Sequence, residues 1–127
     1  MGRLTGCPGR CRRTSLPAAN KGANRVIHVV AVITAKPGQR EAVLKLFQAN
    51  RPAVLAEQGC VEYAPVVDVP DFGKAQAPIG PDSFIVIEKW ESVEALRAHG
   101  AAPHMVAYGQ ATRDLVAGRT IHVLTEA

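Results

Sequence analysis

The chain has 127 residues, of which 47% are hydrophobic and 20% charged. This length and composition are typical of one soluble globular domain, and no apolar run in the sequence is long enough to span a bilayer. The formal net charge of +4 is unevenly distributed, because residues 1–25 contain six Arg and Lys and no Asp or Glu. Nine basic and eleven acidic residues remain, so residues 26–127 are slightly acidic.

Residues 1–25 are rich in Gly, Pro, Arg and Ala and show no hydrophobic periodicity. We therefore expect a disordered basic tail over residues 1–25 and one folded domain over residues 26–127. The tail lacks the aromatic side chains that accompany nucleic-acid binding, so neither nucleic acid nor a membrane is an expected partner. Cys7 and Cys11 have no further metal ligands nearby and are interpreted as free thiols of a reduced, cytoplasmic protein.

The domain opens with the apolar segment Val26–Ala35, VIHVVAVITA. Apolar residues occupy both alternating faces, which is typical of a strand covered on both sides. Residues 36–38 end this strand. Residues 39–59 then carry apolar side chains at helical spacing until Pro52 interrupts the pattern. We expect two helical pieces or one kinked helix, ending at Gly59.

Residues 60–69, CVEYAPVVDV, alternate and predict a second strand with Tyr63 and Val69 on one face. Pro65 has no backbone N–H to donate, so this strand is expected at a sheet edge or with a bulge. Residues 70–82 hold three Pro and two Gly, which predicts a long irregular loop. Loops of this length are uncommon without a function, and we expect this one to cover a cleft or to reach a partner subunit.

The stretch Ser83–His104 runs from a strand into a helix and gathers most of the chemically versatile side chains of the domain. Its apolar, β-branched start predicts a strand that ends at Trp90. Ser92 is suited to cap the N-terminus of the helix that follows. His99 lies near the end of that helix and His104 just beyond it. We interpret this stretch as the candidate site.

Two further elements complete the domain: a helix over Met105–Ala117 and a strand over Arg119–Glu126. The order strand, helix, strand, strand, helix, strand predicts an α+β fold. In this fold, as in ferredoxin-like domains, helices cover one face of a four-stranded antiparallel sheet. The first strand is apolar on both faces, so the second face would be an exposed apolar patch. We therefore expect two copies to pair through these faces as a homodimer.

Four segments give the domain a resemblance to a known family: KPGQREAV after the first strand, EQGCVEY at Glu57–Tyr63, FIVIEKWESVEALRAH at Phe84–His99, and APH at Ala102–His104. In their order and spacing, residues 26–127 resemble the antibiotic biosynthesis monooxygenase family, which includes small quinol monooxygenases. The resemblance implies a dimeric α+β barrel. It also implies a cofactor-independent monooxygenase that oxidises a small hydroxyaromatic, such as a quinol, naphthol or anthrone, with O₂.

Such a reaction needs a base, an apolar pocket and donors that hold an aromatic oxyanion, because a deprotonated hydroxyaromatic can give an electron to O₂. Imidazole titrates near working pH, which makes the two histidines the candidate bases. Aromatic side chains suit the walls of a pocket for a planar ring, and a tyrosine can also donate a hydrogen bond. The candidate site comprises His99 and His104 as bases and Trp90, Tyr63, Asn50 and Arg51 as substrate contacts.

Other interpretations stay open. Trp90 and Tyr63 also suit core positions, and His99 suits a helix C-terminus. Haem-degrading relatives of the family carry a Trp where this chain has His99, and the last helix, after Met105, has no His to ligate iron, which disfavours haem degradation. A metal held by His99 and His104 lacks a third ligand. An isomerase that moves protons with paired histidines, or a non-catalytic ligand-binding protein, fits the same scaffold.

Overall fold

The structure is a computed structural model that describes residues 25–127. The basic tail predicted over residues 1–25 lies, except for Arg25, outside the described residues. Within them no helix is long and apolar enough to cross a membrane. The helices and strands follow in this order: β1 (Ile27–Ala35), α2 (Arg40–Leu55), β2 (Cys60–Val66), β3 (Ser83–Trp90), α3 (Val93–Ala101), α4 (Pro103–Thr112) and β4 (Val116–Leu124).

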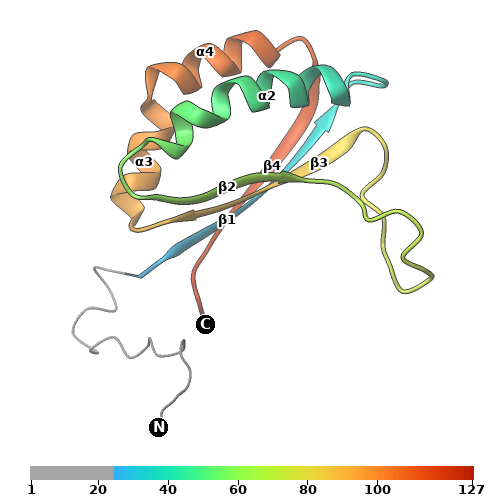
Figure 1. Ribbon diagram of the computed structural model, residues 1–127, viewed down its shortest axis with the longest axis horizontal. Coiled ribbons are helices and arrows are strands. Elements are labelled where there is room, and N and C mark those ends of the chain that lie inside the picture. Colours follow the sequence, from blue (N-terminus) through green and yellow to red (C-terminus); the bar gives the residue numbers. More distant parts are fainter. Residues whose placement is uncertain (1–24) are drawn as a thin grey trace, which may run out of the picture.

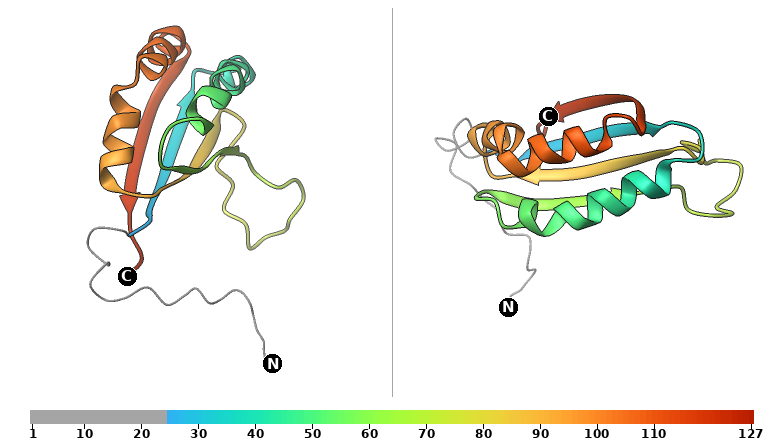
Figure 2. Two further views of the ribbon diagram at one scale, coloured as in Figure 1. Left: turned by 60° about the vertical axis from the view of Figure 1, so that its left-hand side comes forward. Right: turned by 90° about the horizontal axis from the view of Figure 1, so that it is seen from above.

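The four strands form one antiparallel sheet in the order β2-β3-β1-β4, and the three helices lie on one face of it (Figure 1). Seen from above, α2 runs beside β2, and α4 runs beside α2 (Figure 2). This is the ferredoxin-like α+β architecture that the order of elements predicts. Pro65 lies in β2, which is an edge strand as expected.

The core lies between the sheet and the helices, and alternate residues of the two central strands supply most of it. Phe47 of α2 joins them and stacks on Tyr63 of β2, with ring centroids 4.9 Å apart. Burying side chains of this size stabilises the fold by about 1.5–3 kcal/mol each relative to full exposure. The core residues contributed by the two central strands are Ile27, Val29, Ala31, Ala35, Phe84, Val86 and Trp90.

The opposite face of the sheet carries no helix (Figure 1). Val30 and Val32 of β1 and Ile85 and Ile87 of β3 lie on this face and are half-buried. We predicted that β1 is covered on both faces. Within the described residues the helices cover one face of β1, and no helix covers the other (Figure 1). Tyr63 faces the helices and is buried beneath α2.

Two of the predicted boundaries are wrong. Of the two alternatives for the segment that contains Pro52, the structure has a single helix, α2, with Val43, Phe47 and Val54 buried along one side of it. This helix ends at Leu55, and Gly59 lies in the following turn with φ +86°. The second strand ends at Val66 instead of continuing to residue 69.

The end of the chain also differs from the prediction. Helix α4 occupies Pro103–Thr112 and β4 occupies Val116–Leu124, so the helix starts and stops earlier than expected. Proline fits the first turn of a helix, where its missing N–H removes no hydrogen bond. At the other end, Lys36 donates its backbone N–H to the carbonyl of Leu115 at 2.8 Å, and Val116 pairs with Ala35. These contacts with β1 draw the chain into the sheet before it reaches residue 119.

The long loop between β2 and β3, residues 67–82, projects from one end of the sheet (Figure 1). Its base is closed by Asp68, whose two carboxylate oxygens accept the backbone N–H groups of Ile79 at 2.9 Å and Gly80 at 3.0 Å. Arg40 of α2 holds the same base by donating to the carbonyls of Gly80 and Ser83. The loop is thus tied at its base, and Phe72, beyond it, is exposed.

Candidate active site

A cavity of about 510 Å³ lies between the helix face of the sheet and the helices α3 and α4. Its walls are largely apolar, with a few polar side chains among them, which is the usual character of a small-molecule site. The apolar walls come from Val29, Ala31, Ile33, Phe47, Val86, Leu96, Met105, Val106, Ile121 and Val123. The polar side chains include those of Tyr63, Glu88 and His99.

The carboxylate of Glu57 joins the two predicted histidines. Its Oε2 atom lies 3.0 Å from Nδ1 of His99 and 2.6 Å from Nε2 of His104. An ionised carboxylate can only accept hydrogen bonds, so both of these ring nitrogens carry their protons. In the neutral imidazole of His99 the other nitrogen, Nε2, then keeps its lone pair. His99 lines the cavity, which makes this nitrogen the candidate base for a bound molecule.

Local structure explains how three distant elements meet at this point. Ser92 caps α3 as predicted, since its Oγ accepts the backbone N–H of Ala95 at 3.1 Å, and this fixes the start of the helix that carries His99. Ala102 has an extended backbone between α3 and α4, which turns the chain so that His104 comes back toward Glu57. Gly59 accepts the backbone N–H of Glu91 at 2.8 Å, which ties the turn after Glu57 to the end of β3.

Glu88 is a second carboxylate on the cavity wall and is buried on β3. Its Oε1 atom accepts the indole N–H of Trp90 at 2.9 Å. Burial raises the pKa of Glu88, while the hydrogen bond from Trp90 and the nearby His99 lower it, and burial is the larger effect. Glu88 therefore exchanges its proton closer to neutral pH than an exposed glutamate does.

Tyr63 lies beside His99, with the two rings edge to face and their centroids 5.5 Å apart. Burial raises the pKa of Tyr63 well above its ordinary value, and the neighbouring Glu88 raises it further. The hydroxyl therefore stays protonated and can donate a hydrogen bond. The ring of His99 is held from another side by Trp90, at a centroid distance of 4.7 Å.

The structure brings four of the six predicted site residues together. His99 and Tyr63 line the cavity, Trp90 packs behind His99, and His104 reaches the same cluster through Glu57. The other two predicted residues do not line the cavity. Asn50 donates to the sulfur of Met105 at 3.3 Å, and Arg51 donates to the backbone carbonyl of Tyr63 at 2.7 Å. No residue of the loop 70–82 lines the cavity either.

Sequence reasoning missed Glu57 and Glu88 as site residues. A signal existed for Glu88, because Phe84, Val86, Glu88 and Trp90 alternate along β3 and therefore share the buried face. A carboxylate at a core position of an apolar strand is uncommon without a function or a partner. Glu57 had no comparable signal, since it lies in a turn and meets both histidines across more than 40 residues of sequence.

Comparisons with known proteins agree with this geometry. The family model for antibiotic biosynthesis monooxygenase matches residues 26–111. A protein named "Probable quinol monooxygenase YgiN" from Escherichia coli K12 is 43% identical over 101 residues, which cover 78% of this chain and 96% of that protein. The crystal structure of PA3566 from Pseudomonas aeruginosa is similar with a TM-score of 0.68 and 26% identity, covering 83% of this chain and 97% of that one.

A more distant relative shows the fold alone. The structure of Rv0793 from Mycobacterium tuberculosis has a TM-score of 0.66 at 22% identity and covers 80% of this chain and 95% of its own. The family match covers β1 through all but the last residue of α4, while β4, which also lines the cavity, lies beyond it. The chain therefore belongs to the antibiotic biosynthesis monooxygenase family and resembles quinol monooxygenases within it.

Proposed function

We propose that this protein is a cofactor-independent monooxygenase that oxidises a small hydroxyaromatic of the quinol, naphthol or anthrone type with O₂. The observation that carries the proposal is the imidazole of His99, which is oriented by Glu57 on the wall of a largely apolar cavity of about 510 Å³. Membership of the monooxygenase family and the name of the relative that is 43% identical support the same reaction class.

The proposed reaction begins when Nε2 of His99 takes the hydroxyl proton of the substrate. The resulting anion gives one electron to O₂, and the two radicals combine to form a carbon–oxygen bond and a peroxide. Loss of the proton at that carbon then breaks the O–O bond, leaves a carbonyl and releases water. For a quinol the net change is insertion of one oxygen atom at a ring carbon and formation of one water molecule. The substrate supplies all the electrons that reduce O₂.

The surrounding side chains have matching roles. Protonation of His99 produces an imidazolium next to the Glu57 carboxylate, which stabilises that charge. The Tyr63 hydroxyl, kept neutral by burial, is placed beside His99 to donate a hydrogen bond to the oxyanion. His104 contacts the same Glu57 oxygen as His99 and is a positioning residue, since it does not line the cavity.

Oxygen uptake by the protein with a panel of hydroquinones, naphthols and anthrones tests the proposal. We expect uptake above the buffer rate with at least one class, and a decrease of about 100-fold or more in kcat for His99→Ala. Arg97→Ala is the matched control, because Arg97 is exposed on the same helix and does not line the cavity. Uptake at the buffer rate across the whole panel would contradict the proposal and favour an isomerase or a binding protein.

We further propose that the protein is a homodimer that pairs through the sheet face without helices. Val30, Val32, Ile85 and Ile87 form an apolar patch on that face, and soluble proteins rarely leave such patches open to water. The proposed compartment is the cytoplasm, where the thiol of Cys60, free in the described part of the chain, stays reduced.

Sedimentation at micromolar concentration tests the dimer. The wild-type protein should sediment as a dimer, and Ile87→Glu should sediment as a monomer because it places a charge in the apolar patch. Val69→Glu is the matched control, since Val69 is exposed in the long loop outside the sheet. A wild-type protein that sediments only as a monomer would contradict the proposed pairing.

A further inference from the structure

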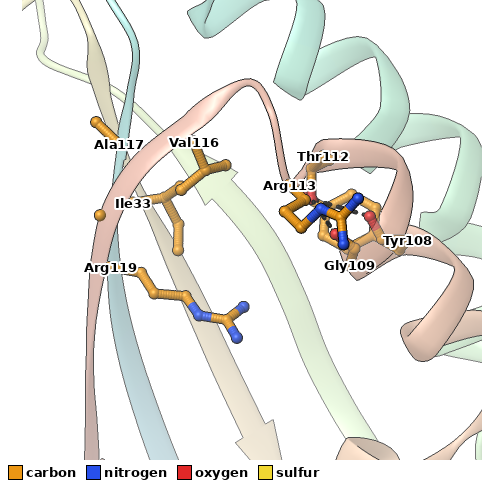
Figure 3. A pocket seen from close by; sticks show the side chains of 9 residues that line it. Ile33, Tyr108, Gly109, Thr112, Arg113, Val116, Ala117 and Arg119 are labelled. Carbon is orange, nitrogen blue, oxygen red and sulfur yellow. Dashed lines mark hydrogen bonds between the residues drawn. The ribbon is translucent and has the colours of Figure 1, made fainter.

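A second cavity, of about 300 Å³, adjoins the first at the far end of α4. Tyr108, Thr112 and Arg113 of the α4 end line it together with Arg119 of β4 (Figure 3). Tyr108 and Arg119 also line the larger cavity, as do Ile33 and Gly109. The two cavities are therefore neighbouring parts of one hollow, with His99 in one part and two arginines in the other.

Strand register places Arg119 on the helix face of the sheet. Arg119 pairs with Ile33, and Ile33 pairs on its other side with the buried Phe84. Figure 3 shows the guanidinium of Arg119 projecting from β4 into the space beside α4, toward the side where Tyr108 and Arg113 lie. Because the proposed dimer would use the opposite face, this position stays open to a ligand.

Arg119 has no partner within the protein as described. Across residues 25–127 its guanidinium makes no hydrogen bond or ion pair, and the hydroxyl of Tyr108 makes no hydrogen bond. Burial raises the pKa of Tyr108 to about 12, so this hydroxyl is a neutral donor. A cation and a neutral donor that share a cavity wall are suited to hold an anion.

The spacing along the sheet defines the length of a suitable ligand. Val123 lies in the same row of the sheet as Glu88, because both pair with Val29. Arg119 is four residues away along β4, which corresponds to about 13 Å of strand. The floor between the two ends is apolar and includes Ala31 and Ile121. The hollow therefore has a base at one end, a cation at the other and an apolar surface between them.

We propose that Arg119 and the Tyr108 hydroxyl form an anion-binding subsite for the carboxylate of an aromatic acid. This assigns a substrate class to the proposed function: a fused-ring hydroxyaromatic whose hydroxyl lies at His99 and whose carboxylate lies at Arg119. A guanidinium can hold a carboxylate through two parallel hydrogen bonds, which adds orientation to affinity. The subsite thereby determines which end of the ring system reaches the base.

Equilibrium binding separates this subsite from the oxidation, which is the part that depends on the proposed function. Calorimetric titration would use 2-naphthoate, an aromatic carboxylate without a reactive hydroxyl, and 2-naphthamide, its neutral counterpart. We expect the wild-type protein to bind the carboxylate about tenfold more tightly than the amide, and Arg119→Gln to remove this preference. Arg119→Lys should keep part of it, because the charge remains while the paired geometry is lost.

Arg97→Gln is the matched control, since it removes the same charge from an exposed site on α3, and it should leave the preference within twofold of wild type. Equal binding of the two ligands by the wild-type protein, no binding of the carboxylate, or an unchanged preference in Arg119→Gln would each overturn the subsite. If the wild-type protein binds the carboxylate more tightly than the amide but shows no oxygen uptake, the anion-binding subsite is supported and the proposed monooxygenase activity is contradicted. Where oxidation is observed, Arg119→Gln should raise KM about tenfold for a hydroxynaphthoate and leave the parent naphthol unchanged.

Discussion

The Nδ1 atom of His99 lies 3.0 Å from Oε2 of Glu57, although the two residues are 42 positions apart in the chain. The side chains of His99 and Glu57 are 8% and 13% exposed, so water and salt screen their interaction weakly. A carboxylate in this position fixes the orientation of the imidazole and stabilises the charge that forms when the ring takes a proton. The pair behaves as one chemical unit that exists only in the folded chain.

Replacing Glu57 with Gln should lower kcat in the oxygen-uptake assay while changing KM less than twofold. The amide keeps the size of the side chain but loses the charge that stabilises the imidazolium. A hydrogen bond to a charged group contributes about 1.5–3 kcal/mol, which corresponds to about a 10- to 100-fold decrease in rate. Steady-state kinetics would measure both parameters.

The matched control for this change is Glu94→Gln, because Glu94 is exposed in the first turn of α3 and lies outside the cluster. Its kinetics should match those of the wild type. If Glu57→Gln raised KM and left kcat unaltered, Glu57 would act on substrate binding instead of on the base, and the proposed role would be wrong.

A double-mutant cycle should reveal the hydrogen bond between Trp90 and Glu88. Trp90→Phe removes the indole donor from a fully buried site and leaves the buried carboxyl of Glu88 without it. We expect a loss of about 2–4 kcal/mol in the free energy of unfolding, from the cavity and the lost partner together. Combining it with Glu88→Met should show coupling of about 1 kcal/mol in urea denaturation. Purely additive effects would rule out the bond as a stabilising contact.

The pH dependence of stability should report on Glu88. Its pKa is raised in the folded protein, so the folded state binds more protons than the unfolded state between the two pKa values. The free energy of unfolding should therefore fall as pH rises from about 4.3, the unfolded value, through the raised folded pKa. Glu88→Gln keeps an acceptor for the Trp90 indole and should flatten this part of the profile. Identical urea midpoints against pH for both proteins would contradict the assignment.

Gly59→Ala should destabilise the protein by about 2–4 kcal/mol and reduce activity. The residue has φ +86°, and a Cβ there would lie 2.6 Å from the Cβ of Ala95, so both backbone strain and overlap with α3 oppose the change. The turn that holds Glu57 would shift with it. Gly38→Ala separates the two causes, because Gly38 has φ +78° but open space around its Cα. We expect about 1 kcal/mol for Gly38→Ala, and equal losses at both sites would show that the overlap has no effect.

Much of the fold could be predicted because local patterns and the final packing agree. The β-branched runs of β1 and β3, and Ser92 as the cap of α3, each specify their own structure and are confirmed. The predictions fail where a contact between residues far apart in the sequence determines the local structure. Val116 joins the sheet because it pairs with Ala35 of β1, and Leu115 just before it accepts a hydrogen bond from Lys36. No pattern within residues 105–117 predicts these contacts.

The residues of the candidate site also divide into those that the sequence could suggest and those that become important only through contacts in the folded chain. His99 and Tyr63 could be proposed from the sequence because their side-chain chemistry matched the reaction that the resemblance implies. Glu57 could not, since its importance comes from meeting two imidazoles supplied by α3 and α4. Asn50 and Arg51 were proposed from their place at an interruption of the helical pattern, yet α2 runs on through Pro52. Both side chains bond to residues of the cavity wall, Met105 and Tyr63, and do not line the cavity themselves.

The hydrogen bonds that Asp68 accepts from Ile79 and Gly80 close the base of the long loop and separate its outer part from the rest of the domain. Residues inserted in this outer part, for instance next to the exposed Phe72, would extend outward without altering how β2 and β3 pair. That stretch is a natural attachment point for a fluorophore or an affinity handle. It would let the molecule be immobilised or tracked while the candidate site stays undisturbed.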